Sequence, residues 1–306
     1  TEPFVATKLV ASSTPQFLND AFQRTLAHWN RERLAPGFPD VDWRRTFDRQ
    51  MQMLRLEGAF LDELRAEVAG DLAAVPEEAH AFVAWFEALQ DKGPGQNHPL
   101  FAWLAETATV GQMRWFLTQE AAGEAGFDDL VAMTQVKMPH GPKLELAENY
   151  WDEMGRGQLR GIHGLLLTEL VAAMTIDPQI ETTVWESLAL ANAMTAMATT
   201  RRYAWLSVGA LGVVELTAPW RCVHVSRGLK RLGFGQRERL YYDLHSHIDV
   251  KHSAGWNKNA LLPLVAEDPR RARFIAEGAL IRMRCAERCF DRYAELLEDG
   301  AEIHVG

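Results

Sequence analysis

Apolar residues recur along this 306-residue chain at helical spacings, and this periodicity constrains the fold more than any other feature. The clearest example is the stretch from Asp40 to Val68, whose apolar residues lie three, four and seven positions apart. These residues are Trp43, Phe47, Met51, Leu54 and Leu61. The same pattern continues in Glu78–Leu89, Val110–Glu124, Leu159–Met174, Val184–Trp205, Val208–Leu229, Gln236–Trp256 and Pro269–Leu297. Since no clear alternating runs bounded by turn residues occur, we predict an all-α fold.

Two segments interrupt the helical pattern. Asp91–His98 (DKGPGQNH) and Met138–Lys143 (MPHGPK) combine Gly, Pro and polar residues, which is typical of loops. The first loop divides the chain into an N-terminal helical section, residues 1–92, and a larger section, residues 93–306. We also expect Pro219 to end or kink the helix that carries Glu215, because proline cannot donate a backbone hydrogen bond.

The charge and composition exclude some classes of partner. The formal net charge is −9, which argues against a nucleic-acid surface. The sequence contains no run of eighteen uncharged apolar residues, so no membrane span is predicted, and its first residues lack the order of a secretory signal. The three cysteines, Cys222, Cys285 and Cys289, are interpreted as buried, reduced thiols of a cytoplasmic protein.

The segment Tyr241–Trp256 (YYDLHSHIDVKHSAGW) carries the strongest chemical signal. On a helix, His245, Asp249 and His252 fall on one face, within about 60° of one another, whereas His247 falls nearly opposite. Two imidazoles and a carboxylate on one face suit iron or manganese. The alternative is a helix whose histidines only form local hydrogen bonds at a bundle surface.

Carboxylates within apolar helices add to this signal. Glu215 is the only charged residue from Leu206 through Trp220, and a buried unpaired carboxylate usually has a partner or a metal ion. Glu153 and His163 are ten residues apart, close to three helical turns, so both can face one interior. The alternatives are an exposed position for Glu215 and a hydrogen-bonded core histidine for His163.

A further candidate, Glu120, follows the apolar and aromatic run GQMRWFLT, although nearby acidic residues also fit a solvated face.

Together the candidate ligands are Glu120, Glu153, His163, Glu215, His245, Asp249 and His252. The four carboxylates in this set would neutralise two ferrous ions, and helical bundles hold di-iron centres with such inward-pointing side chains. A non-catalytic helical scaffold, whose histidines and glutamates are ordinary polar groups, is the alternative from another class.

At these residues the sequence resembles the heme-oxygenase-like diiron oxidase and oxygenase superfamily, often described as iron-containing redox enzymes. The resemblance covers roughly residues 99–297 and rests on an ordered series of motifs. The series is FLTQE, DEMGRGQLRGIH, the Glu215 segment with Pro219 and GLKRLG, and the His-x3-Asp-x2-His pattern of Tyr241–Trp256. It implies a heme-oxygenase-like seven-helix bundle that binds two iron ions directly, without heme. It also implies that O2 is the co-substrate and reacts through a peroxo-diferric intermediate.

The resemblance also bears on the substrate. The family's fatty-acid decarboxylase and amino-acid lyase branch has a ligand Glu three residues before the helix-two His, where this sequence has Arg160. The pattern with Glu153 is more similar to the N-oxygenase branch. It implies a small amine-bearing or amino-acid-like substrate, oxidised at nitrogen or at a neighbouring C–H bond. Oxidative decarboxylation or C–C cleavage of a fatty or other acid is the alternative.

Partners follow from the same resemblance. An external electron donor is expected, and the N-terminal section is interpreted either as a homodimerisation element or as a lid on the bundle. Basic residues are candidates for binding a substrate carboxylate. Those considered are Arg160, Arg202 and Arg221, with Arg201 and Lys251 as further possibilities.

Overall fold

The structure of the protein is a computed structural model that describes residues 16–39, 42–123 and 126–303. Within these ranges the regular structure is helical, and the only β-type pairing is an isolated bridge between Met154 and Ile162. The prediction of an all-α fold is therefore confirmed. None of the helices described is long and apolar enough to cross a membrane.

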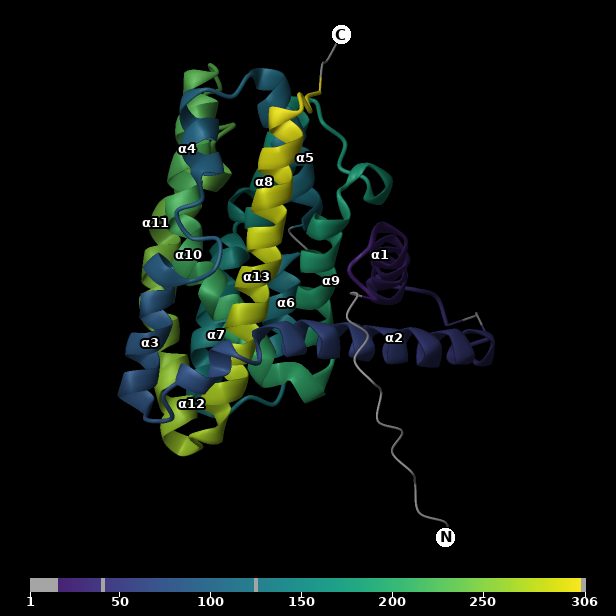
Figure 1. Cartoon of the computed structure of the whole chain (residues 1–306), viewed down its shortest axis with the longest axis vertical. Coiled ribbons are helices and arrows are strands. Elements are labelled where there is room, and N and C mark those ends of the chain that lie inside the picture. Colours follow the sequence, from purple (N-terminus) through teal and green to yellow (C-terminus); the bar gives the residue numbers. More distant parts are fainter. Residues whose placement is uncertain (1–15, 40–41, 124–125, 304–306) are drawn as a thin grey trace.

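The helices follow the chain in a simple order (Figure 1). They are α1 (Asp20–Leu34), α2 (Arg44–Val68), α3 (Ala79–Lys92), α4 (Pro99–Glu106), α5 (Val110–Gly123), α6 (Phe127–Thr134), α7 (His140–Glu153), α8 (His163–Met174), α9 (Trp185–Thr199), α10 (Ala204–Arg231), α11 (Leu240–Gly255), α12 (Leu262–Glu267) and α13 (Arg270–Glu298). Short turns η1 (Asp71–Ala74), η2 (Gly155–Gly157), η3 (Leu159–Gly161), η4 (Ile180–Thr182) and η5 (Arg201–Tyr203) separate some of them, and a π-helical turn, Trp256–Leu261, continues α11.

Helix α10 forms the centre of the bundle. It packs against α13, α11, α4 and α9, and most of its residues between Ala204 and Pro219 are buried. Two glycines let α10 and α13 approach closely. A Cβ atom on Gly209 would strike the Ile275 carbonyl oxygen, and one on Gly278 would strike the Leu206 carbonyl oxygen. Glycine at both positions thus lets the two backbones touch.

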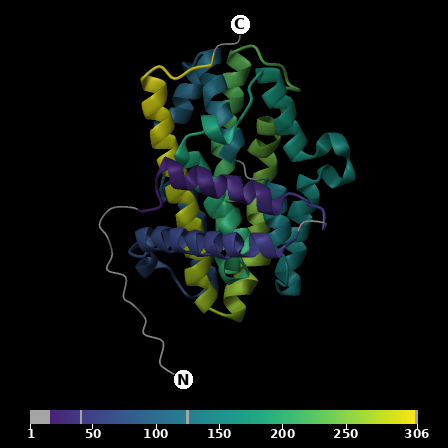
Figure 2. The same cartoon turned by 90° about the vertical axis from the view of Figure 1, so that its right-hand side faces the viewer.

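The N-terminal helices do not form a single unit beside the bundle. Helices α1 and α2 lie across the bundle axis, as the two views in Figures 1 and 2 show, and they contact α9 and α13. Helix α3 instead packs against α10 and α12 within the bundle. The division of the chain at residue 92 remains a prediction. Helix α3, which precedes residue 93, packs with helices that follow it.

The structure corrects two local expectations. Pro219 was expected to end or kink its helix, and it does not end it, because α10 continues through it to Arg231. Proline costs one backbone hydrogen bond, and the packing of α10 against α11 and α13 offsets that loss. The loop predicted at Met138–Lys143 is shorter, since α7 already begins at His140. The loop predicted at Asp91–His98 is present at residues 93–98, since α3 continues to Lys92 and α4 begins at Pro99.

Candidate metal centre

The candidate ligands come from five helices around one interior cavity. Glu153 is the last residue of α7, and His163 is the first residue of α8. Glu120 lies on α5 and Glu215 on α10. His245, Asp249 and His252 share α11, whereas His247 is exposed on the other side of that helix, as predicted.

The connection between Glu153 and His163 differs from the expected three helical turns. Gly155, Arg156 and Gly157 all have positive φ values, which breaks the helix immediately after Glu153. Gly155 also lies so close to Gly161 that a Cβ atom would strike its backbone. The chain therefore folds back in a compact loop, and the loop brings the two side chains together.

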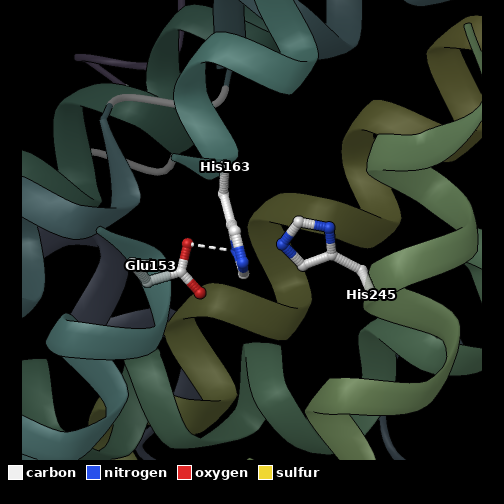
Figure 3. Close-up of side chains that lie close together, drawn as sticks. All are labelled: Glu153, His163 and His245. Atoms are coloured by element: carbon white, nitrogen blue, oxygen red, sulfur yellow. Dashed lines mark ion pairs between the residues drawn. The ribbon is translucent and has the colours of Figure 1, made fainter. Parts of the chain in front are cut away.

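The first cluster consists of Glu153, His163 and His245 (Figure 3). One ligand atom of each residue lies within 4.8 Å of the others. The Nδ1 atom of His163 is 2.7 Å from Oε2 of Glu153. The two imidazole rings meet edge to face, with centroids 4.6 Å apart. Two imidazoles and a carboxylate from three helices thus converge on one point.

The second cluster consists of Glu153, Glu215 and His252, whose ligand atoms also lie within 4.8 Å of one another. All three side chains are buried. The Nδ1 atom of His252 is 3.3 Å from Oε2 of Glu215. Glu153 belongs to both clusters, so its carboxylate lies between two groups of potential metal ligands.

Neighbouring groups orient the imidazoles and one carboxylate. The Nδ1–H of His245 donates to the Tyr241 carbonyl oxygen at 2.7 Å, which leaves Nε2 as the ligand atom. Nε2 of His252 is 3.1 Å from Oδ2 of Asp152, and this contact directs its Nδ1 toward the second cluster. The Asn149 side-chain amide donates to Oε1 of Glu215 at 2.6 Å.

Two buried nitrogen atoms indicate that these clusters fit a cation. Nδ1 of His163 and Nδ1 of His252 have no hydrogen-bond partner among the described residues, although each lies near a carboxylate oxygen. Buried polar atoms are nearly always hydrogen-bonded. An imidazole nitrogen that faces carboxylate oxygens is the arrangement that a metal ion completes, so the residues present fit the iron that the motifs imply.

The electrostatics of the metal-free site support this interpretation. Burial, followed by the charge of Glu215, raises the pKa of Glu153 well above its usual value. Burial, followed by the charge of His252, lowers the pKa of His163 to about 4. Burial, followed by the electrostatic effect of His163, lowers the pKa of His245 to about 4. These two imidazoles are therefore neutral at physiological pH, the state in which they can bind a metal.

His252 behaves differently. Burial by itself would lower its pKa, but the nearby carboxylates of Glu215, Asp152 and Glu153 together raise the pKa of His252 to about 9. In the metal-free protein a proton on this imidazole therefore balances part of the carboxylate charge. A metal ion would replace that proton.

A cavity of about 110 Å³ adjoins the clusters. Besides Glu153, Glu215 and His245, its charged lining residues are Glu120, Asp249, Arg221 and Arg282. Glu120 and Asp249 thus face the same space as the clusters, although neither belongs to the two compact groups formed by the described residues. The Glu120 carboxylate lies near Arg221, Arg282 and the Tyr293 hydroxyl, and burial raises its pKa.

The other candidate arginines lie elsewhere. Arg160 is exposed on η3, and Arg202 is exposed on η5, where its guanidinium lies over the Tyr203 ring. Neither lines the cavity. Of the four arginines considered from the sequence, Arg160, Arg201, Arg202 and Arg221, only Arg221 lines the cavity.

Sequence reasoning missed three residues at this site. Asp152 and Asn149 precede Glu153 by one and four positions on α7. Their closeness in sequence to a candidate ligand is the feature that could have identified them. Arg282 is the third, and it lies on a helix rich in arginine. Its place in the cavity has no distinguishing signal in the sequence.

Comparison with known proteins agrees with this geometry. The family model described as iron-containing redox enzyme matches residues 114–287, more than half of the chain. The chain belongs to this family. The matched range contains every member of the two clusters and all the charged residues of the cavity named above.

Solved structures support the fold of this iron-containing redox enzyme. Two crystal structures of a CADD-like protein of unknown function from Nostoc punctiforme superpose with a TM-score of 0.51 at 17% identity. The alignments cover 79% and 82% of this chain, and 98% and 100% of the Nostoc chains. At this identity the likeness shows the heme-oxygenase-like fold alone. No curated protein matches the sequence.

Proposed function

We propose that this iron-containing redox enzyme is a nonheme diiron oxidase or oxygenase acting on a small amine-bearing or amino-acid-like substrate. The observation that carries the proposal is the sharing of buried Glu153 between two donor clusters. A carboxylate has two oxygen atoms, so one side chain can serve two metal ions. Bundles with this type of donor set hold paired iron ions.

The residues of each cluster define the proposed sites. His163 and His245 would hold one iron with Glu153, and His252 and Glu215 would hold the other. Asp249 and Glu120 would supply further oxygen donors from the cavity wall. When bound, the iron pair supplies activation of O2, with electrons from an external donor. The product is the substrate oxidised at nitrogen or at a neighbouring C–H bond.

The surrounding protein prepares the site for this chemistry. The low pKa values of His163 and His245 keep both imidazoles neutral for binding iron. Asp152 and Tyr241 orient His252 and His245 by hydrogen bonds. Cys222, Cys285 and Cys289 are buried and, among the described residues, form no disulfide, and we propose that the enzyme works in the reducing cytoplasm.

A second candidate is oxidative decarboxylation or C–C cleavage of a fatty or other acid on the same fold. The cavity has both charged and apolar lining residues, and its volume of about 110 Å³ favours a small substrate over a long alkyl chain. The non-catalytic scaffold is disfavoured because the histidines and carboxylates converge in the interior, where leaving them unpaired is costly.

Anaerobic iron loading followed by O2 exposure tests the proposed function. We expect about two ferrous ions per chain, and faster O2 consumption when the amine-bearing substrate is present. Amino acids, amines and fatty acids should be screened together. Failure to retain iron would contradict a diiron enzyme, whereas alkene formation from fatty acids would favour the second candidate.

A further inference from the structure

The cavity beside the clusters contains two arginines that hold no iron. Arg221 lies on α10 and Arg282 on α13, and both line the space that Glu153 and His245 also face. Both guanidiniums remain charged at neutral pH. Burial, followed by repulsion from the nearby Arg221, lowers the pKa of Arg282 to about 10.

Few anions compensate these two charges. Glu120 is the carboxylate whose charge acts on both guanidiniums, but in the part of the chain that the structure describes neither arginine forms an ion pair. Cys285 and Cys289 lie near Arg282, yet burial raises the pKa of Cys285 to about 11 and raises the pKa of Cys289 well above its usual value. Both thiols are therefore neutral and cannot compensate a guanidinium.

The charge balance of the whole cavity favours an anionic ligand. Four carboxylates line it, from Glu120, Glu153, Glu215 and Asp249. Two ferrous ions, as the proposed function requires, would balance these four charges. Arg221 and Arg282 would then remain uncompensated in a buried space, and a buried charge without a partner is unfavourable. One additional carboxylate would relieve most of this cost.

The guanidinium of Arg221 is also held in position by neighbouring groups. Nη1 of Arg221 donates to the backbone oxygen and to the hydroxyl of Thr217, at 3.3 and 3.1 Å. The same guanidinium lies over the Phe290 ring, 5.6 Å from its centroid. No described residue accepts a hydrogen bond from its other donors, and the planar guanidinium fork matches a carboxylate.

We propose that Arg221 and Arg282 bind the carboxylate of the substrate, which makes the substrate a small carboxylic acid whose other end reaches the clusters. The cavity of about 110 Å³ limits that acid to amino-acid size. This inference rests on the proposed function for the reaction, but the carboxylate site itself can be tested without turnover.

Thermal-shift screening of the iron-loaded, O2-free protein tests the site. The probes are the twenty common L-amino acids and the straight-chain acids from propionate to octanoate. The strongest ligand is then compared with its uncharged carboxamide by calorimetry. We expect the carboxylate to bind and the carboxamide to bind much more weakly. The variant Arg282→Gln should raise the dissociation constant about ten- to a hundredfold.

Matched variants separate recognition from damage to the fold. Arg284→Gln lies on the same helix but removes a surface arginine that pairs with Asp71 and Glu287, so ligand binding should not change. Arg282→Lys keeps the charge without the fork and should restore binding in part. Arg221→Gln provides a second loss-of-binding variant, and circular dichroism and iron content should match the wild type throughout.

Three results would overturn the proposal: no carboxylate in the panel binds, the carboxamide binds equally well, or Arg282→Gln and Arg221→Gln both bind like the wild type. Iron analysis keeps the two proposals apart. Arginine-dependent carboxylate binding without iron uptake would contradict the diiron function alone. Iron uptake and O2 consumption with arginine-independent binding would contradict the carboxylate site alone.

Discussion

Nε2 of His252 lies 3.1 Å from Oδ2 of Asp152, so a carboxylate outside both clusters orients an imidazole whose other nitrogen faces the second cluster. Asp152 is in turn held by Arg156, whose Nε donates to Oδ1 at 2.6 Å. Interactions of this type set the orientation and basicity of metal-bound histidines. Asp152 is therefore a positioning residue for the metal centre.

We expect Asp152→Asn to weaken iron binding by about ten- to a hundredfold, because the amide cannot replace the negative charge beside His252. Competition with an iron chelator measures the affinity. Glu148→Gln is the matched control, because Glu148 lies on the same helix as Asp152 but forms an exposed ion pair with Lys251. Equal iron affinity in both variants would show that Asp152 does not act on the metal centre. An NMR titration should also show a lower pKa for His252 in metal-free Asp152→Asn.

Replacing candidate ligands should remove iron without unfolding the bundle. His252→Ala and Asp249→Ala each delete one proposed donor of the candidate metal centre, whereas the core consists of apolar side chains from many helices. We expect loss of iron and of O2 consumption, with most of the far-ultraviolet helical signal retained. Iron content and circular dichroism should be measured on the same samples. Wild-type iron content in both variants would show that these residues are not ligands.

The stability of the metal-free protein should fall in alkaline solution because of His252. Its folded pKa of about 9 exceeds the ordinary 6.5, so its contribution is fully present below about pH 6.5 and is lost as the pH rises through about 9. The shift corresponds to roughly 3 kcal/mol. Urea unfolding of metal-free wild type and His252→Asn, from about pH 6 to about pH 9.5, measures the difference. A constant difference across this range would contradict the assignment.

Homodimerisation remains a proposal, and α2 offers a surface for it. Trp43, just before α2, and Phe47 and Leu54 on that helix are 61%, 48% and 44% exposed, so this apolar stripe is uncovered. Phe47→Glu should convert a dimer to a monomer, measured by sedimentation equilibrium. Leu144→Glu, at an exposed leucine on α7, is the control and should leave the dimer intact. A monomeric wild type would favour the lid interpretation.

Close packing of α10 and α13 should make Gly278 intolerant of substitution. In Gly278→Ala the new methyl group would strike the Leu206 backbone, which cannot move as easily as a side chain. We expect the free energy of unfolding to fall by about 1–3 kcal/mol. Gly141→Ala on α7 is the control, because no atom lies within 4 Å of its new methyl group. Chemical denaturation compares the two variants with the wild type. Equal stability of Gly278→Ala and Gly141→Ala would show that α10 and α13 can separate at little cost.

The sequence by itself determined the helical class and one face of the metal centre. Both depend on spacing within a single helix. His245, Asp249 and His252 lie three and four residues apart, so helix geometry alone places them together and turns His247 away. The isolated charge of Glu215 in an apolar helix likewise predicted its burial.

Tertiary structure decided the rest, because those relationships depend on distances between helices. Glu153 and His163 meet through a loop with positive φ values, whereas their spacing of ten residues suggested continuous helical turns. The continuity of α10 through Pro219 depends on packing from neighbouring helices, which local propensity does not include. Arg282 faces the same cavity as Arg221 because α13 packs against α10, so no local pattern distinguishes it from the other arginines of its helix.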